Sequence, residues 1–234
     1  MGVGFDDLTR ENAIDLCKRL IDEHRSAYMV TPNPEIVMAA WENAELHDAI
    51  CNADLVIPDG IGVVKAARII GTPLKERLPG IEIGEAILEY AAQTGKSVFL
   101  LGAKPGVADA AKEKMQETYP GLNVCGTNDG YFKDDDPVIE KINAAQPDFL
   151  MVCLGAPKQE YFIKRHQSDL NVRLMIGLGG SLDSFAGTVR RAPKWMIRLQ
   201  LEWLYRLIKQ PSRFVRMLAL PKFVLAALKK RMKG

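Results

Sequence analysis

The sequence lacks every common spacing of metal-ligating residues. Its four cysteines form no CxxC pair and its three histidines no HExxH motif, so neither a zinc site nor a His-based metal centre is expected. The cysteines stand in apolar stretches, which favours reduced, structural thiols in a cytosolic protein. These residues are Cys17, Cys51, Cys125 and Cys153, and His24, His47 and His166.

Long apolar runs are also missing. The N-terminus, "MGVGFDDLTRENA", carries acids where a signal peptide needs bases followed by an apolar stretch, so export is not expected. The best candidate for a membrane span, "MLALPKFVLAAL", is interrupted by Pro221 and Lys222 and falls short of the roughly 18 apolar residues required. With 234 residues, 47% hydrophobic and 26% charged, the chain is expected to be globular and soluble, with a core that needs no disulfide or metal.

Acids are almost absent from the last 47 residues. Residues 188–234 hold 13 Lys and Arg against one acid, Glu202, a charge of +12, whereas residues 1–187 carry 18 bases and 28 acids, a charge of −10. Such an asymmetry predicts a polyanionic partner, either nucleic acid or an anionic membrane surface. From Ala192 onward the spacing predicts two or three helices, broken near Pro211 and Pro221. Basic residues, leucines and two tryptophans suit an interfacial amphipathic helix, although a helical cap packed on the body would carry the same pattern.

The first 187 residues alternate apolar strand patterns with helical ones, and contain no internal repeat. Buried strands alternating with helices predict an α/β fold, a Rossmann-like, mostly parallel sheet with helices on both faces. The expected division is an α/β catalytic domain over 1–187 and a basic helical appendage over 188–234. Strands are predicted at 27–31, 54–57, 97–102, 123–126, 149–155 and 172–180, and helices near 9–21, 34–46, 61–70, 80–94, 104–119, 136–145 and 157–167.

Small or hydrogen-bonding residues follow five of the predicted strands. In a parallel sheet these positions share the carboxyl edge, where open α/β folds bind their ligands. The convergence of five strand ends therefore predicts a site at this edge. The residues are Thr31 and Asn33, then Asp59 and Gly62, then Gly102 and Lys104, then Gly155 to Glu160, and finally Gly179 to Ser181.

Taken singly, each of these signals has a structural alternative. "LLGAKPGVADAA" could seat a phosphate at a helix start, but it is not GxGxxG, and Gly102 could simply serve a tight turn. Asp59 could accept a proton from a hydroxyl, or could cap a turn before Gly60. Arg77 could neutralise a phosphate through two hydrogen bonds. The "DDD" run at 134–136 resembles a DxD metal motif but fits better as a solvated helix start.

Six segments in order also resemble a known family. "TPNPEIV", "PDGIGVV", "ERLPG", "LLGAKPGVA", "PDFLMVCLGAPKQE" and "AGTVRRAPKW…LEWLYRL", spread over residues 5–216, closely resemble the bacterial WecG/TagA/CpsF glycosyltransferases, glycosyltransferase family 26. The resemblance implies transfer of a sugar, typically N-acetylmannosamine or its uronic acid, from a UDP donor. It implies as acceptor a polyprenyl-diphosphate-linked N-acetylglucosamine at the cytoplasmic membrane face, in cell-wall or exopolysaccharide synthesis.

The same resemblance implies roles for individual residues. Asp59 would be the general base of an inverting displacement, and Arg77 would stabilise the leaving diphosphate. Thr31 and Asn33 would hold the donor, and Gln159 would touch its sugar. No metal and no cofactor are implied, and the basic appendage would bind membrane and help close the site. With the strand-end positions added, the expected substrate-binding set is Thr31, Asn33, Gly62, Gly102, Lys104, Gln159, Asp183, Arg206, Arg213 and Arg216.

Two departures from the family pattern bear on specificity. Gln200 stands where relatives have Gly in "RLGLEWLYRL", and Glu82 takes the place of an Asp. The sequence does not decide between N-acetylmannosamine, its uronate and another UDP-hexose such as UDP-glucose. A nucleic-acid-binding regulator and a dinucleotide-dependent oxidoreductase are the other classes considered, but no nucleic-acid motif and no dinucleotide fingerprint supports them. Homo-oligomers remain possible.

Overall fold

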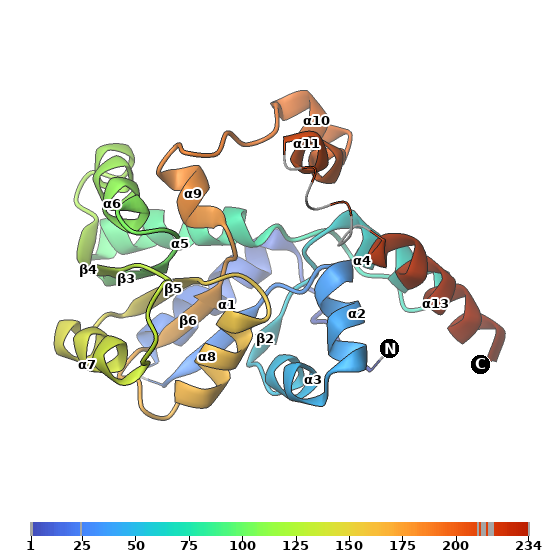
Figure 1. Cartoon of the computed structure of the whole chain (residues 1–234), viewed down its shortest axis with the longest axis horizontal. Helices are drawn as coiled ribbons and strands as arrows, with labels where there is room; N and C mark the ends of the chain where they lie inside the picture. The colour runs from blue at the N-terminus through green and yellow to red at the C-terminus, as the bar shows by residue number, and fades with distance from the viewer. Residues whose placement is uncertain (1, 24, 210, 212–213, 215–217, 234) are drawn as a thin grey trace.

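The structure is a computed structural model that describes residues 2–23, 25–209, 211, 214 and 218–233. Among these residues six strands form one sheet in the order β2-β1-β6-β5-β3-β4, and every neighbouring pair is parallel (Figure 1). The α/β fold expected from the sequence is therefore confirmed. The strands are β1 Ala27–Val30, β2 Leu55–Val56, β3 Ser97–Gly102, β4 Asn123–Asn128, β5 Phe149–Cys153 and β6 Leu174–Gly177.

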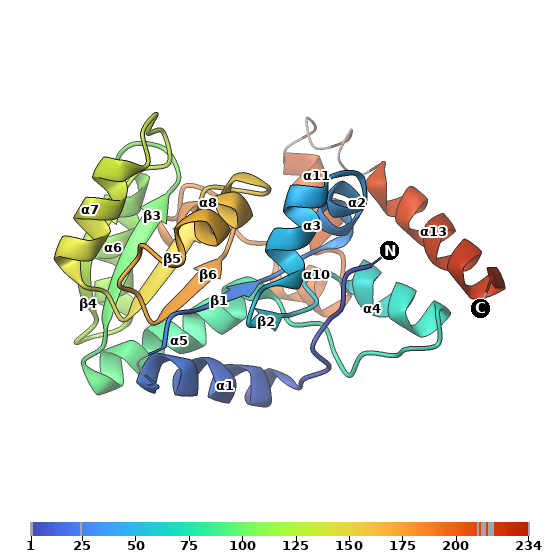
Figure 2. The same cartoon turned by 90° about the horizontal axis from the view of Figure 1, so that it is seen from below.

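Helices cover both faces of the sheet. Two buried clusters define the layers: one joins α1, α5, α6 and α9 to the sheet, and the other joins α2, α3, α7 and α8. Figure 2 shows α1 and α5 on one side of the sheet with α3, α7 and α8 on the other. The helices are α1 Arg10–Asp22, α2 Pro34–Glu42, α3 Ala44–Cys51, α4 Ile61–Ile69, α5 Gly80–Thr94, α6 Val107–Thr118, α7 Asp136–Ala145, α8 Lys158–His166, α9 Ser181–Phe185, α10 Lys194–Arg198, α11 Glu202–Lys209 and α13 Ala219–Lys233.

The central strands are apolar on both sides because each side meets a helical layer. In β3, Val98 and Leu100 belong to the first cluster, while Phe99 and Leu101 belong to the second. All four are fully buried. Burial of one such side chain stabilises the fold by about 1.5–3 kcal/mol, so continuous apolar strands fix the sheet at the centre of the body.

Three sequence predictions need correction. The helix expected over 34–46 is two helices, because Asn43 adopts an extended conformation and its side chain caps α3 by accepting a hydrogen bond from the Leu46 amide. The region after β6 contains a short helix, α9, where only a glycine turn was expected. Pro221 does not break a helix: it lies in the first turn of α13, where its missing N–H has no intrahelical acceptor to serve. The break expected near Pro211 lies among residues that are largely outside the described part of the chain, and α11 is described as far as Lys209.

Within the described part of residues 188–233, the helices are α10, α11 and α13, and residues 188–193 are irregular. Figure 1 shows α10 and α11 standing beyond the sheet, joined to α9 by an extended segment, whereas α13 lies along α4 beside α2. Phe223 and Ala227 of α13 are buried against Val37 of α2 and Val63 of α4. No helix in the described part of the chain is long and apolar enough to cross a membrane.

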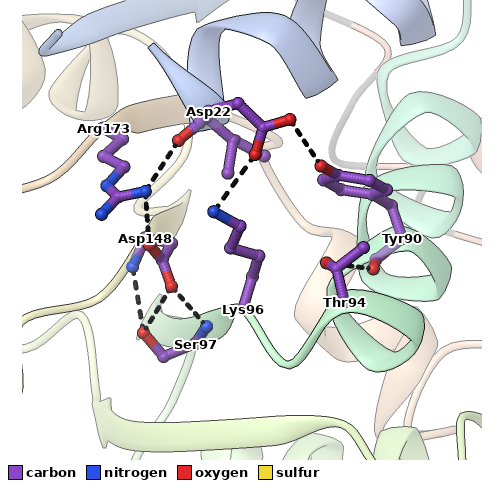
Figure 3. A network of polar contacts seen from close by, with 8 residues as sticks. Asp22, Tyr90, Thr94, Lys96, Ser97, Asp148 and Arg173 are labelled. Atoms are coloured by element: carbon purple, nitrogen blue, oxygen red, sulfur yellow. Dashed lines mark hydrogen bonds and ion pairs between the residues drawn. The ribbon is translucent and has the colours of Figure 1, made fainter. Parts of the chain in front are cut away.

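The amino edge of the sheet is fixed by a polar network (Figure 3). Asp148 accepts hydrogen bonds from the Ser97 amide at 2.8 Å and from the Ser97 hydroxyl at 3.1 Å, and pairs with Arg173 at 3.2 Å. Asp22 pairs with Lys96 at 3.1 Å and accepts from Tyr90 at 2.8 Å, and these bonds lower the pKa of Asp22. The network ties the ends of α1 and α5 to the starts of β3, β5 and β6. The carboxyl edge opposite is built differently.

Candidate active site

Asp59 lies three residues after the end of β2, on the loop that leads into α4. The Ile57 amide donates to the Val30 carbonyl at 3.1 Å, which continues the β1–β2 pairing up to the edge of the sheet. Gly60 then takes φ +106° and begins α4, a conformation that glycine adopts without strain. A Cβ at Gly62, in the first turn of α4, would lie 2.7 Å from the Pro34 ring, so the start of α4 packs close against α2. The Asp59 side chain is 34% exposed, which leaves its carboxylate accessible at the edge.

Arg77 lies beside Asp59 and is shared between two carboxylates. Its Nη2 is 3.7 Å from Asp59 Oδ1 and donates a 2.8 Å hydrogen bond to Glu202 Oε2. The Arg77 side chain is 16% exposed and that of Glu202 8%. Burial lowers the pKa of Arg77, but the Glu202 hydrogen bond and the charges of Asp59 and Glu202 outweigh burial and raise it above its ordinary value. Arg77 is therefore a fixed cation at the site.

Thr31 and Asn33 end β1 at the same edge. The Thr31 hydroxyl donates to the Gly177 carbonyl of β6 at 3.1 Å, and the residue is 8% exposed. The Asn33 side-chain oxygen accepts from the Ile36 amide at 3.0 Å and so caps α2. A hydroxyl that donates to the backbone keeps its lone pairs as acceptors, and Asn33 keeps its amide as a donor. Both residues are structural in this state and retain polar capacity for a ligand.

Gln159 lies buried beneath the carboxyl edge of the sheet. It is 2% exposed, its Oε1 accepts from the Gly179 amide at 2.9 Å, and its Nε2 donates to Glu160 Oε1 at 2.9 Å. Glu160 is 1% exposed, its second oxygen has no hydrogen-bond partner among the described residues, and burial raises the pKa of its carboxyl group. The Gln159 side chain thus fixes the glycine turn after β6 through its hydrogen bond with the Gly179 amide. Gln159 itself is buried, and the turn lies at the surface of the carboxyl edge.

Two of the predicted binding positions, Gly62 and Gly102, serve packing. The third, Lys104, lies at the surface. Gly102 takes φ +132°, and a Cβ there would lie 2.3 Å from the Cys153 carbonyl oxygen, so glycine permits the close approach of β3 and β5. Gly62 serves the α2–α4 contact in the same way. Lys104 is exposed on the loop before α6, with its charge available to an anion.

Asp183 belongs to α9 and anchors the segment that leaves the body. Its carbonyl accepts from the Thr188 hydroxyl at 2.9 Å and from the Val189 amide at 3.1 Å. Two residues further on, Arg191 pairs with Glu82 at 2.8 Å. Glu82, the departure from the family pattern, therefore links the outgoing segment to α5, and it also pairs with Arg10 at 3.8 Å.

The C-terminal segment brings one acid, Glu202, to the site, whereas the side chains of its three predicted site arginines are not among those described. Arg206 is described for its backbone alone, in α11, and Arg213 and Arg216 lie outside the described residues. Glu202 is a functional candidate that the sequence reasoning missed. Its signal was its isolation as the single acid among 13 bases, which composition alone could not connect to Arg77.

The candidate residues spread along the edge rather than forming one cluster. β1 and β3 are separated by β6 and β5, and neighbouring strands lie about 4.8 Å apart, so Thr31 and Gly102 are roughly 14 Å apart. Asp59, Arg77 and Thr31 occupy one end of this line and Lys104 the other. The connections after β5 and β3 also run in opposite directions, to β6 and β4, which is where open α/β sheets form a ligand crevice.

The remaining sequence signals have structural roles. Asp136 begins α7 and Asp135 pairs with His166 at 2.9 Å, so the acid run is a helix start as expected. In the part of the chain that the structure describes, no group of His, Cys, Asp or Glu could hold a metal ion. All four cysteines are free, but the apolar setting expected for Cys51 is wrong: it is exposed and lies 3.6 Å from the His47 ring.

Together the fold and the site define a Rossmann-like α/β protein with an acid–cation pair at the carboxyl edge of its sheet. The chain belongs to the WecG/TagA/CpsF glycosyl transferase family, whose model matches residues 1–234. It is a glycosyltransferase of that family, as the sequence motifs indicated.

Curated relatives carry a more specific name. Proteins of Bacillus spizizenii W23 and Bacillus subtilis 168 are each 42% identical to this chain, over 89% and 91% of it and 81% and 83% of their own lengths. A Staphylococcus aureus MRSA252 protein is 34% identical over 100% of this chain and 92% of its own. Each is named N-acetylglucosaminyldiphosphoundecaprenol N-acetyl-beta-D-mannosaminyltransferase.

Proposed function

We propose that the protein transfers N-acetylmannosamine from a UDP donor to N-acetylglucosamine linked to undecaprenyl diphosphate, in cell-wall polymer synthesis. The names of the relatives support the sugar and the acceptor. The observation that carries the mechanism is the juxtaposition of a partly exposed carboxylate, Asp59, with the cation Arg77 at the carboxyl edge.

The proposed reaction is a single displacement with inversion at the anomeric carbon. Asp59 accepts the proton of the acceptor hydroxyl while that oxygen forms a bond to the anomeric carbon and the bond to the UDP oxygen breaks. Negative charge develops on the departing diphosphate, and cations fixed in advance stabilise it without reorganisation. Arg77 supplies one such charge beside the base. The proposal uses no metal and no cofactor.

The donor would lie along the edge of the sheet. The sugar end would face Asp59 and Thr31, and the nucleotide end would extend toward the loop that carries Lys104. Thr31 and Asn33 would use the hydrogen-bonding capacity that their backbone contacts leave. Gln159 would act through the Gly179 turn that it holds, and Asp183 through the segment that it anchors.

Residues 188–234 would form a separate functional unit that acts at the inner face of the cell membrane. Each Lys or Arg near an anionic leaflet contributes about 1 kcal/mol, so a segment of +12 has ample attraction. Arg206, Arg213 and Arg216 would add positive charge near the donor when this unit closes over the site. A second candidate donor is another UDP-hexose such as UDP-glucose. It would take part in the same reaction but would need a sugar pocket of a different shape.

The test is UDP release from a panel of UDP-sugars with a short-chain lipid-diphosphate N-acetylglucosamine acceptor, in the presence of EDTA. Release with UDP-N-acetylmannosamine alone supports the proposal. Release with another donor instead replaces the sugar, and a requirement for added metal contradicts the mechanism.

A further inference from the structure

Glu160 is a buried acid that the proposed mechanism does not use. It lies in the first turn of α8, which packs over β5 and β6 in Figure 2, and it is 1% exposed. Its Oε1 accepts the 2.9 Å hydrogen bond from Gln159, whereas its Oε2 has no hydrogen-bond partner among the described residues. Burying a carboxyl group with one oxygen unsatisfied costs stability, so its presence here calls for a function other than packing.

The hydrogen bonds of Gln159 show what Glu160 holds in place. Gln159 Oε1 accepts from the Gly179 amide at 2.9 Å. A side-chain amide carries its acceptor on one side and its donors on the other, and Glu160 Oε1 is the acceptor that the nitrogen faces. Rotating the amide by half a turn would set an N–H against the Gly179 N–H and an oxygen against Glu160 Oε1. Glu160 therefore selects the orientation in which Gln159 holds Gly179.

The turn held in this way borders the proposed donor site. β6 lies between β1, which leads to Thr31, and β5, which leads to Gln159. At the end of β6 the Gly177 carbonyl accepts from the Thr31 hydroxyl at 3.1 Å. A Cβ at Gly177 would lie 2.8 Å from Gln159 Nε2, so the Gln159 amide packs directly against the strand end. A displaced amide would therefore move the turn relative to Thr31.

We infer that Glu160 is a positioning residue for donor binding: its Oε1 fixes the amide of Gln159, and through that amide the turn beside Thr31 against which the sugar end of the donor binds. The inference rests on the proposed function, in which the donor lies along this edge. It requires an acceptor oxygen at Oε1 and no negative charge. Burial raises the pKa of Glu160, which favours the neutral acid with its hydrogen on Oε2 and Oε1 left as the acceptor.

Two neutral substitutions separate the acceptor from the charge. Glu160→Gln keeps a carbonyl oxygen toward Gln159 and places an amide nitrogen where the neutral acid has its hydroxyl, so KM for the donor should stay within about twofold of wild type. Glu160→Met has nearly the same length but offers only a weak thioether acceptor. Loss of one neutral hydrogen bond should raise its KM roughly fivefold to tenfold. In both variants kcat should stay within about twofold, because Asp59 and Arg77 are unchanged.

The experiment measures steady-state UDP release with UDP-N-acetylmannosamine and the lipid-diphosphate N-acetylglucosamine acceptor. It compares wild type, Glu160→Gln, Glu160→Met, Gln159→Met and the double variant with methionine substituted at both positions. If Glu160 acts through Gln159, Glu160→Met raises KM in the wild-type background and adds nothing in the Gln159→Met background. Glu140→Met is the control, because it replaces an exposed acid of α7 and should leave both constants unchanged.

Thermal melting of each variant checks folding, and Glu160→Leu replaces Glu160→Met if the latter does not melt cooperatively. If neither apolar variant melts cooperatively, Glu160 serves the fold as a whole and the inference is wrong.

Three kinetic results overturn the inference alone: an unchanged KM in Glu160→Met, an equal rise in Glu160→Gln, or a full further rise in the Gln159→Met background. The second would make the negative charge the functional feature, and the third would separate Glu160 from Gln159. Absence of UDP release by wild type instead contradicts the proposed function and the inference with it.

Discussion

The backbone amide of Leu78 donates a hydrogen bond to the carbonyl of Pro58 at 2.9 Å. Because each partner is the chain neighbour of a site residue, this bond brings Arg77 beside Asp59 across 18 positions of sequence. Leu78 is fully buried, so the pairing is anchored in the core and does not depend on the side chains it presents. The acid–cation pair is a consequence of backbone packing, which makes side-chain substitutions there informative.

Asp59→Asn should remove turnover while leaving UDP binding largely intact. The amide keeps the size of the side chain but accepts no proton, so the rate should fall about 10²–10⁴-fold. UDP release measures turnover and isothermal titration measures UDP binding. Asp134→Asn, in the exposed acid run before α7, is the matched control and should retain wild-type activity. A wild-type rate in Asp59→Asn would exclude Asp59 as the base.

Gly102→Ala should destabilise the fold more than Gly95→Ala. Both glycines have positive φ, +132° and +72°, but a Cβ at Gly102 would meet the Cys153 backbone, whereas a Cβ at Gly95 meets open space. Strain in the left-handed region costs about 1–2 kcal/mol at Gly95, and overpacking adds about 1–3 kcal/mol at Gly102. Urea unfolding of the two variants measures the difference, and equal destabilisation would argue against a packing role for Gly102.

The sequence was informative where one local rule decided the structure. Apolar runs of four to six residues identified β1, β3 and β5 because burial on both faces requires them, and the strand ends placed Thr31 and Asp59 on one edge. The break at Asn43 was missed because an apolar helical pattern continues through it, and only the side-chain cap interrupts the helix.

Other features of the site depend on contacts distant in sequence. The family resemblance implies that Gln159 touches the donor sugar, which stays a prediction, and the sequence gives no sign that its side-chain oxygen accepts from the Gly179 amide, 20 positions away. Glu202 lies 125 positions from Arg77, so no local pattern could join them. The charge count singles out Glu202 as the one acid of residues 188–234. The folded structure is needed to show that it accepts a hydrogen bond from Arg77.

Glu160→Gln should make the stability of the protein less dependent on pH. Burial raises the pKa of Glu160 in the folded state, so between its unfolded value and its raised folded value the native state binds more protons than the unfolded state. The free energy of unfolding contributed by this group therefore falls as pH rises through that interval. A glutamine carries no charge to bury and removes the dependence.

Urea unfolding of wild type and Glu160→Gln at pH 5 and pH 8 measures this effect. The variant should gain stability relative to wild type on going from pH 5 to pH 8. Glu45→Gln, at an exposed position, should change little between the two conditions. A Glu160→Gln variant that loses relative stability at pH 8 would mean that the ionised carboxylate is favoured in the fold.

The outer face of α13 provides the test of membrane attachment. Leu225 and Leu228 are 58% and 42% exposed, whereas Phe223 on the same helix is 2% exposed and packs against the body. Leu225→Ser with Leu228→Ser should lower binding to vesicles containing an anionic phospholipid by roughly tenfold or more, since each fully buried leucine contributes about 1.5–3 kcal/mol.

Net charge is unchanged, so electrostatic attraction remains, and the melting temperature should stay near wild type because neither side chain is buried in the fold. Tyr131→Ser removes a large side chain that is 68% exposed on the body and should leave co-sedimentation with vesicles unaltered. If the double variant binds vesicles as wild type does, α13 does not insert, and attachment must come from charge or from another part of the chain.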